Sequence, residues 1–195
     1  NLALSTRGTY ALGQVGLLDE IMKQAIPMKG RMIHPPEAEL FFQPYGKNDT
    51  EVIYSISRGG LNQSLMDLAE QHGVKIHFNR KCTGINFNTS RLNFYDELSG
   101  QETTIPAETV IGTDGSASAI RAEMAKKRRF NFSQNYLAHG YKELSIPAGP
   151  ANSFLLAKNA LHIWPRGTYM LIALANPDGS FTCTLFFPFE GKYSF

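Results

Sequence analysis

Hydrophobic residues recur at helical spacing in two early parts of the chain. Between residues 8 and 24 the apolar positions lie three or four residues apart, and Pro27 closes the segment. Ser57 is typical of a helix N-cap, three leucines follow it at helical spacing, and Gly73 stands where a C-cap glycine is expected. The pattern predicts helices over these two segments, and the small residues of 116–127 predict a third.

Short apolar runs separated by turn residues predict strands elsewhere. Before Phe130 such runs lie at 32–34, 40–42, 52–56, 75–79, 92–95, 103–105 and 109–111. The runs at 92–95 and 103–105 are joined across Ser99-Gly100, which is typical of a hairpin. After Phe130 four alternating runs predict an antiparallel sheet, at 141–146, 160–164, 169–174 and 181–186.

Helical and strand-rich segments alternate along the chain. Helix–strand–helix material at 1–28 and 57–128 is interrupted and followed by sheet material at 29–56 and 129–195. A chain that leaves a scaffold and returns to it predicts an α/β (α+β) protein in which a mostly antiparallel β-sheet domain is inserted into a second domain.

Composition narrows the range of partners. The chain has 195 residues, 43% of them hydrophobic, which is enough for one sizeable core or two small lobes. The net charge of +2 is too small to indicate nucleic acid or a membrane surface, and no apolar run approaches the ~18 residues of a membrane span. Cys82 and Cys183 are far apart, which predicts reduced thiols in a cytoplasmic protein, and the histidines have no metal-ligand spacing.

The most informative stretch runs from Val110 to Arg121. An apolar pair leads into Gly-Thr-Asp-Gly, then into small residues that open a helix, then into an arginine. Gly115 gives a ligand close access to the backbone. This stretch resembles the Asp-Gly fingerprint of the aromatic-ring flavin hydroxylases. In that superfamily it works with an upstream Gly-rich loop and a downstream Gly-Asp motif, and the chain has neither.

Further motifs are more specific than the Asp-Gly stretch. The segments 1–8, 26–34, 44–46, His-Ile-Trp-Pro-Arg at 162–166 and Ser-Phe-Thr-Cys-Thr-Leu-Phe at 180–186 resemble the kynurenine 3-monooxygenase family. The resemblance covers essentially the whole chain. It implies that 1–28 and 57–128 are part of an FAD-binding Rossmann-like domain, and that 29–56 and 129–195 form the substrate-binding sheet domain. The family uses NADPH to reduce FAD and hydroxylates L-kynurenine to 3-hydroxykynurenine through a C4a-hydroperoxyflavin.

The resemblance also implies a substrate site. Arg31 and Tyr45 match the pair that binds the substrate carboxylate, which a planar guanidinium can hold bidentately. Taken without the resemblance, they are an exposed strand arginine and a loop tyrosine. The apolar positions that line the ring pocket are Ala3, Leu161, Ile163, Met170, Ile172, Leu174 and Phe186. Alternating apolar residues are also ordinary core, and periodicity does not separate the two readings.

Four residues match cofactor-binding positions of the family: Arg58, Asp114, Gly115 and Arg121. Arg58 begins a predicted helix, where a cation and the helix N-terminus suit phosphate or ribose oxygens, although a surface arginine fits that position too. Arg121 is expected to hydrogen-bond within the Asp-Gly motif. No catalytic side chain and no metal are expected, because the cofactor carries the chemistry.

Both chain ends are typical of a piece of a longer protein, since Asn1 opens inside an apolar run and the chain stops after a strand-like run. We therefore expect this piece alone to bind FAD weakly or not at all and to be inactive. A homodimer and a C-terminal membrane anchor in the longer protein stay open. Two other functions stay open: a flavin hydroxylase with another aromatic substrate, and a non-catalytic small-molecule-binding module.

Overall fold

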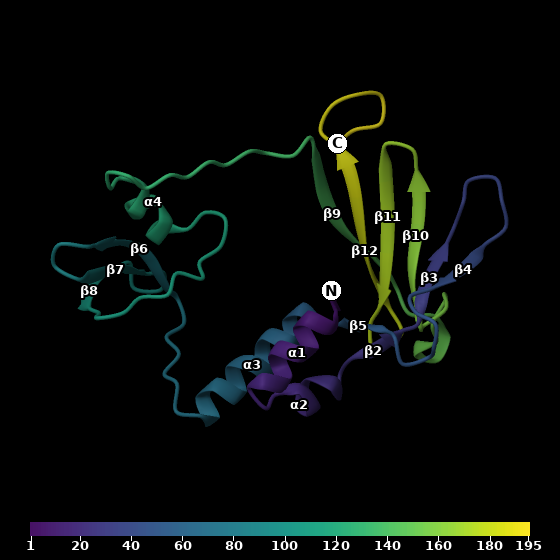
Figure 1. Cartoon of the computed structure of the whole chain (residues 1–195), viewed down its shortest axis with the longest axis horizontal. Helices are drawn as coiled ribbons and strands as arrows, with labels where there is room; N and C mark the ends of the chain where they lie inside the picture. Colours follow the sequence, from purple (N-terminus) through teal and green to yellow (C-terminus); the bar gives the residue numbers. More distant parts are fainter. The chain divides into compact units, whose positions relative to one another are not determined.

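The computed structural model describes residues 1–195, which fold into two compact units. Asn1–His72 and Leu137–Phe195 form the first unit, and Gly73–Tyr136 form the second. Each unit has its own sheet or sheets and its own helices, as Figure 1 shows. The predicted cofactor domain (1–28 and 57–128) and substrate domain (29–56 and 129–195) do not coincide with these two units. The assignment of those segments to cofactor and substrate stays a prediction.

A six-stranded sheet dominates the first unit. Its strands are β3 (Gly30–Ile33), β4 (Phe41–Pro44), β9 (His139–Ile146), β10 (Ala160–Arg166), β11 (Tyr169–Ala175) and β12 (Phe181–Pro188). Their order across the sheet is β4-β3-β10-β11-β12-β9 (Figure 1). The four strands predicted after Phe130 are confirmed, and they pair antiparallel. The one parallel pairing joins β3 to β10, which more than a hundred residues of chain separate, as a parallel pair requires a long connection.

A small sheet and three helices complete the first unit. The sheet has the order β1-β5-β2, formed by Leu2–Leu4, Ile53–Ile56 and Ile26–Met28. The helix predicted over 8–24 is two helices, α1 (Thr6–Gln14) and α2 (Leu18–Met22), because Gly16 adopts a φ of 70° between them. The next helix, α3 (Arg58–Gln71), begins as predicted: the Gly60 amide donates to Ser57 Oγ at 3.2 Å. None of the chain's helices is both long and apolar enough to cross a membrane.

The hydrophobic core of the first unit lies on one face of the large sheet. Its fully buried members are Ile26, Ala173, Ala175, Phe181 and Cys183. Partly buried Trp164 and Leu171 pack against them. Burial also raises the pKa of the Cys183 thiol, since the thiolate would lose its hydration. The side chains on the opposite face of β10, β11 and β12 do not belong to this cluster.

The second unit combines a three-stranded sheet with one helix. β6 (Arg80–Asn86), β7 (Arg91–Asp96) and β8 (Glu102–Pro106) form the sheet, and α4 (Ala119–Ala125) packs against β6. The β7–β8 hairpin confirms the prediction, and Gly100 takes a φ of 70° in its turn.

Two strand predictions in the second unit are wrong. Residues 75–77 and 110–111 have no regular structure, residues 78–79 form a turn and residue 109 a bend, and none of them pairs with a strand. The strand that does form there, β6, was missed. It begins directly after Asn79, whose φ of 56° turns the chain.

Candidate functional site

The face of the large sheet opposite the core carries the predicted substrate residues. Residues that pair across neighbouring strands project their side chains to the same face. Leu161 pairs with Arg31, Ile163 with Ile172, and Met170 with Phe186. Leu174 shares that face with Ile172, because side chains alternate along a strand. The fold thus brings Arg31 and all six sheet residues of the predicted pocket onto one surface.

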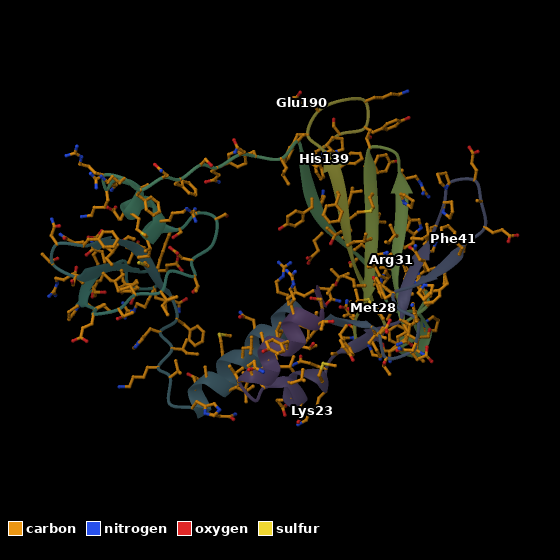
Figure 2. All side chains as sticks on the ribbon, viewed as in Figure 1. Lys23, Met28, Arg31, Phe41, His139 and Glu190 are labelled. Carbon is orange, nitrogen blue, oxygen red and sulfur yellow. The ribbon has the colours of Figure 1, made fainter.

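Arg31 and Tyr45 are in direct contact at one edge of this face. The Arg31 guanidinium carbon lies 5.0 Å from the centroid of the Tyr45 ring, in cation–π range. Arg31 Nη1 also donates to Gln43 Oε1 at 3.5 Å, across the β3–β4 pair. Figure 2 labels Arg31 on β3, the strand that lies between β10 and the edge strand β4.

The Tyr45 hydroxyl is the one buried side-chain polar atom of the structure that lacks a hydrogen-bond partner. Its burial raises the pKa of Tyr45, and the Arg31 guanidinium, which lies close to the hydroxyl without the alignment of a hydrogen bond, acts in the opposite direction. A buried hydroxyl without a partner costs free energy, so such an atom calls for an explanation such as a ligand. The hydroxyl and the guanidinium together present donors suited to a carboxylate.

The apolar residues of this face differ in exposure. Leu161, Ile163, Met170, Ile172 and Phe186 are partly exposed, whereas Leu174 is buried. Partly exposed large apolar side chains on a surface that the core does not use suit contact with an apolar ligand. Ala3 lies elsewhere: it belongs to β1 in the small sheet and pairs with Ser55.

Arg58 lies at a polar hollow in the first unit. The hollow has a volume of about 580 Å³ and is lined by Asn1, Ser57, Arg58, Gly59, Glu143, Asn176, Pro177, Asp178 and Thr182. The first amides of α3 lack intrahelical partners, and only that of Gly60 is bonded to Ser57. Arg58 and the start of α3 therefore provide donors and positive potential suited to phosphate or hydroxyl oxygens.

The Asp-Gly loop of the second unit holds itself together. Ser118 Oγ donates to Asp114 Oδ1 at 2.6 Å, and the Ala119 amide donates to Oδ2 at 2.8 Å. The bond from Ser118 lowers the pKa of Asp114 most, and backbone amides add to it. Asp114 thus stabilises the start of α4, while its own contacts lie within the motif.

Arg121 closes the same loop, as the sequence predicted. Its guanidinium donates to the Gly115 carbonyl at 3.0 Å and to the Ser116 carbonyl. Gly115 adopts a φ of 79°, which a residue with a Cβ adopts only under strain. Beside the loop, a cavity of about 390 Å³ is lined by residues 109–114 together with Cys82, Leu92, Phe94 and Ile120. The roles of these residues toward a cofactor stay predictions.

Comparison with known protein families decides the class. The FAD binding domain family matches residues 3–143. The chain belongs to this FAD-binding domain family. The match includes Arg31, Tyr45, Arg58 and the whole Asp-Gly loop. FAD is therefore the cofactor that this family implies.

Three curated relatives of this chain share a name. The chain is 55% identical to "Kynurenine 3-monooxygenase" of Myxococcus xanthus, over 100% of this chain and 42% of the relative. The proteins of that name from Dictyostelium discoideum and Stenotrophomonas maltophilia are 50% and 47% identical, over 42% and 43% of their lengths. The chain thus spans less than half the length of the curated relatives it matches.

Solved structures show the same fold at low identity. The flavin-dependent monooxygenase PieE, in complex with FAD and substrate, superposes with a TM-score of 0.76 at 13% identity, over 97% of this chain and 36% of PieE. Klebsiella pneumoniae HpxO, complexed with FAD and uric acid, gives 0.70 at 14% identity, over 96% and 46%. The α+β architecture is therefore that of FAD-dependent monooxygenases.

Two groups of residues in this chain suit parts of FAD. The Arg58 hollow has a cation, a helix start and side-chain acceptors, which suit a phosphate or a polyol. Gly115 of the Asp-Gly loop leaves the backbone open, since a Cβ there would meet no atom within 4 Å. FAD, where bound, supplies the redox and oxygen chemistry.

Sequence reasoning missed polar residues on the substrate face. Gln43 contacts Arg31, and Thr182 and Thr184 pair with Leu174 and Ile172. The next strand places Glu143 opposite Thr184. No pattern in the sequence indicated them, because the face to which they belong depends on register between strands far apart in the chain.

Proposed function

We propose that this chain forms the substrate-binding sheet, and part of the FAD site, of an NADPH-dependent monooxygenase that hydroxylates L-kynurenine to 3-hydroxykynurenine. Residues 29–56 and 129–195 would serve the substrate, and 1–28 and 57–128 the cofactor. The observation that carries the proposal is the Arg31–Tyr45 pair, with its buried, unpartnered hydroxyl, at the edge of an apolar sheet face. The name shared by relatives at 47–55% identity supports the choice of substrate.

The distance between the charged edge of the face and its apolar side chains suits an aromatic amino acid. Arg31 on β3 is two strands away from Ile172 and Leu174 on β11, a separation of about 10 Å at the usual strand spacing. A carboxylate held by Arg31 and Tyr45 would therefore place an aryl ketone across β10, against Leu161 and Ile163. The apolar side chains would exclude water from the ring, while the donors at the edge fix its direction.

Residues of this chain bind and orient the substrate in the proposed reaction. Arg31 would hold the carboxylate bidentately, and the Tyr45 hydroxyl would donate a further hydrogen bond. NADPH-reduced FAD would supply the activated oxygen. Arg58 and the Asp-Gly loop with Asp114, Gly115 and Arg121 would bind the cofactor. No acid–base side chain of this chain is required for the transfer.

The decisive experiment uses the full-length protein with FAD bound. Kynurenine should stimulate NADPH oxidation, and 3-hydroxykynurenine should form in proportion to the NADPH consumed. NADPH oxidation without hydroxylated product, or hydroxylation only of an aromatic compound without an amino-acid carboxylate, would refute the substrate assignment. We further propose that the 195-residue chain alone retains FAD weakly and does not turn over. A purified chain that stays yellow through desalting would contradict this.

A further inference from the structure

Two histidines are hydrogen-bonded to each other on the core side of the large sheet. His34 Nε2 lies 2.9 Å from His162 Nδ1, and His162 Nε2 lies 2.9 Å from the Ala157 carbonyl oxygen. His162 is only 2% exposed. The His34 ring stacks on Trp164, with ring centroids 4.1 Å apart. Neither histidine has a part in the proposed reaction.

The carbonyl of Ala157 determines both tautomers. A carbonyl oxygen only accepts, so His162 Nε2 carries a proton and donates it. In the neutral ring Nδ1 is then an acceptor, and His34 must donate from Nε2. The three groups form a directed relay, His34 to His162 to Ala157, in which every buried polar atom at the contacts is satisfied.

The relay begins directly after the strand that carries Arg31. His34 directly follows β3, and its amide extends the ladder by donating to the Ile163 carbonyl at 2.8 Å. Its own carbonyl accepts from Arg166 Nη1 at 2.9 Å. On its other side β3 has only β4, the edge strand, whose residues are exposed. The attachment of β3 to the rest of the sheet therefore depends on β10 and on the groups around His34.

Side-chain alternation connects the relay to the substrate face. Arg31 and Ile33 project to one side of β3, and Met32 and His34 project to the other. A shift of the end of β3 along β10 would move the Arg31 guanidinium relative to Leu161, its partner in the register.

We propose that His34 and His162 are positioning residues, which hold β3 against β10 so that Arg31 meets the substrate carboxylate. This inference rests on the proposed function. The two histidines act only on the position of Arg31, because neither imidazole reaches the substrate face.

Two substitutions at one position test the role of the donor. His34→Phe keeps a ring to stack on Trp164 but leaves His162 Nδ1 without its donor, whereas His34→Gln keeps an N–H near the position of Nε2. In the full-length protein with FAD, His34→Phe should raise the KM for kynurenine at least about fivefold with little change in kcat, because uniform substrate binding is lost. His34→Gln should restore most of the wild-type KM.

A ligand without a carboxylate separates positioning from general damage. 2-Aminoacetophenone contains the aryl ketone of kynurenine but offers nothing to Arg31. Its inhibition constant should be the same for wild type and His34→Phe. An equal weakening of both ligands, or an unchanged KM in an active His34→Phe enzyme, would overturn the positioning role. A wild-type protein that forms no 3-hydroxykynurenine would overturn the proposed function instead.

The relay itself is testable without substitution. Selective ¹⁵N labelling of histidine in the full-length protein should show both rings as Nε2–H tautomers near neutral pH. An Nδ1–H tautomer at His162 would overturn the relay, whatever the activity of the variants.

Discussion

The guanidinium of Arg31 lies over the ring of Tyr45, 5.0 Å from its centroid, while the Tyr45 hydroxyl is buried and has no hydrogen-bond partner. Gln43 is the one side chain that accepts a hydrogen bond from Arg31. Arg31 therefore keeps most of its donors free at the edge of an apolar face, and the Tyr45 hydroxyl lies buried beside it without a partner. Such an arrangement costs folding free energy and is suited to a carboxylate ligand.

Replacing Arg31 should weaken substrate binding. Arg31→Ala removes the charge-assisted hydrogen bonds to the carboxylate, so the KM for kynurenine should rise by about ten- to a hundredfold. Arg31→Lys keeps the charge but lacks the planar fork, and it should recover only part of the loss. Steady-state kinetics of the full-length protein measure both. An unchanged KM in Arg31→Ala would refute the role of Arg31 as the carboxylate clamp.

Tyr45→Phe should change stability and binding in opposite directions. Removal of the unsatisfied hydroxyl should raise the free energy of unfolding of the ligand-free protein by about 1 kcal/mol. The same change should raise the KM for kynurenine, because one donor to the carboxylate is lost. Denaturant unfolding and steady-state kinetics test the two halves. A lower stability together with an unchanged KM would show that the hydroxyl has an internal role.

Asp114→Ala should loosen the start of α4. The carboxylate accepts from Ser118 and from the Ala119 and Ile120 amides, so these two amides should exchange their hydrogens faster in the variant. Ser118→Ala is the matched comparison: it removes the bond to Asp114 and the cap that Ser118 Oγ gives the Arg121 amide, so it should speed exchange at Arg121 while the Ala119 and Ile120 amides keep their bonds to Asp114. Hydrogen exchange of α4 distinguishes the two variants. Equal protection in wild type and Asp114→Ala would contradict the capping role.

Acid should destabilise the first unit through buried His162 and its partly buried partner His34. Burial lowers the pKa of His162 and of His34, and the neighbouring His162 and Arg166 lower that of His34 further. Unfolded histidines take up protons below pH 6.5, at which the folded pair still resists protonation. The free energy of unfolding should therefore fall as pH drops below about 6.5 and level off below the folded pKa values.

Urea unfolding at a series of pH values measures this dependence. The His34→Gln variant lacks one of the two groups and should show a shallower fall between pH 7 and 5. A slope as steep as that of the wild type would mean that other groups cause the acid sensitivity.

Much of the fold followed from local pattern. The helix after Ser57 has the predicted cap at its start and Gly73 with a positive φ at its end, because both signals act within one or two turns. The hairpin at Ser99-Gly100 and the strands after Phe130 formed for the same reason. The strands predicted at 75–79 and 109–111 failed because an apolar run becomes a strand only beside a partner, which no local pattern supplies.

The candidate site was less accessible to sequence reasoning. Arg31 and Tyr45 came from resemblance to a family, and their mutual contact, as well as the unpartnered hydroxyl, came from the structure. Gln43 and the His34–His162 pair gave no signal, because each depends on a pairing between β3 and a strand whose register the sequence does not display.

The sequence by itself determined the class of fold, the Asp-Gly loop and its closure by Arg121, and the residues to be tested. These depend on local hydrogen bonds, turn chemistry and motifs, all of which lie within short stretches of chain. Only the tertiary structure decided that Met170, Ile172 and Leu174 lie on the face of Arg31, opposite the cluster of Ala173 and Phe181, and that Leu174 is buried there. Period-two alternation is symmetric between the two faces of a sheet. What packs against each face depends on segments far away in the chain.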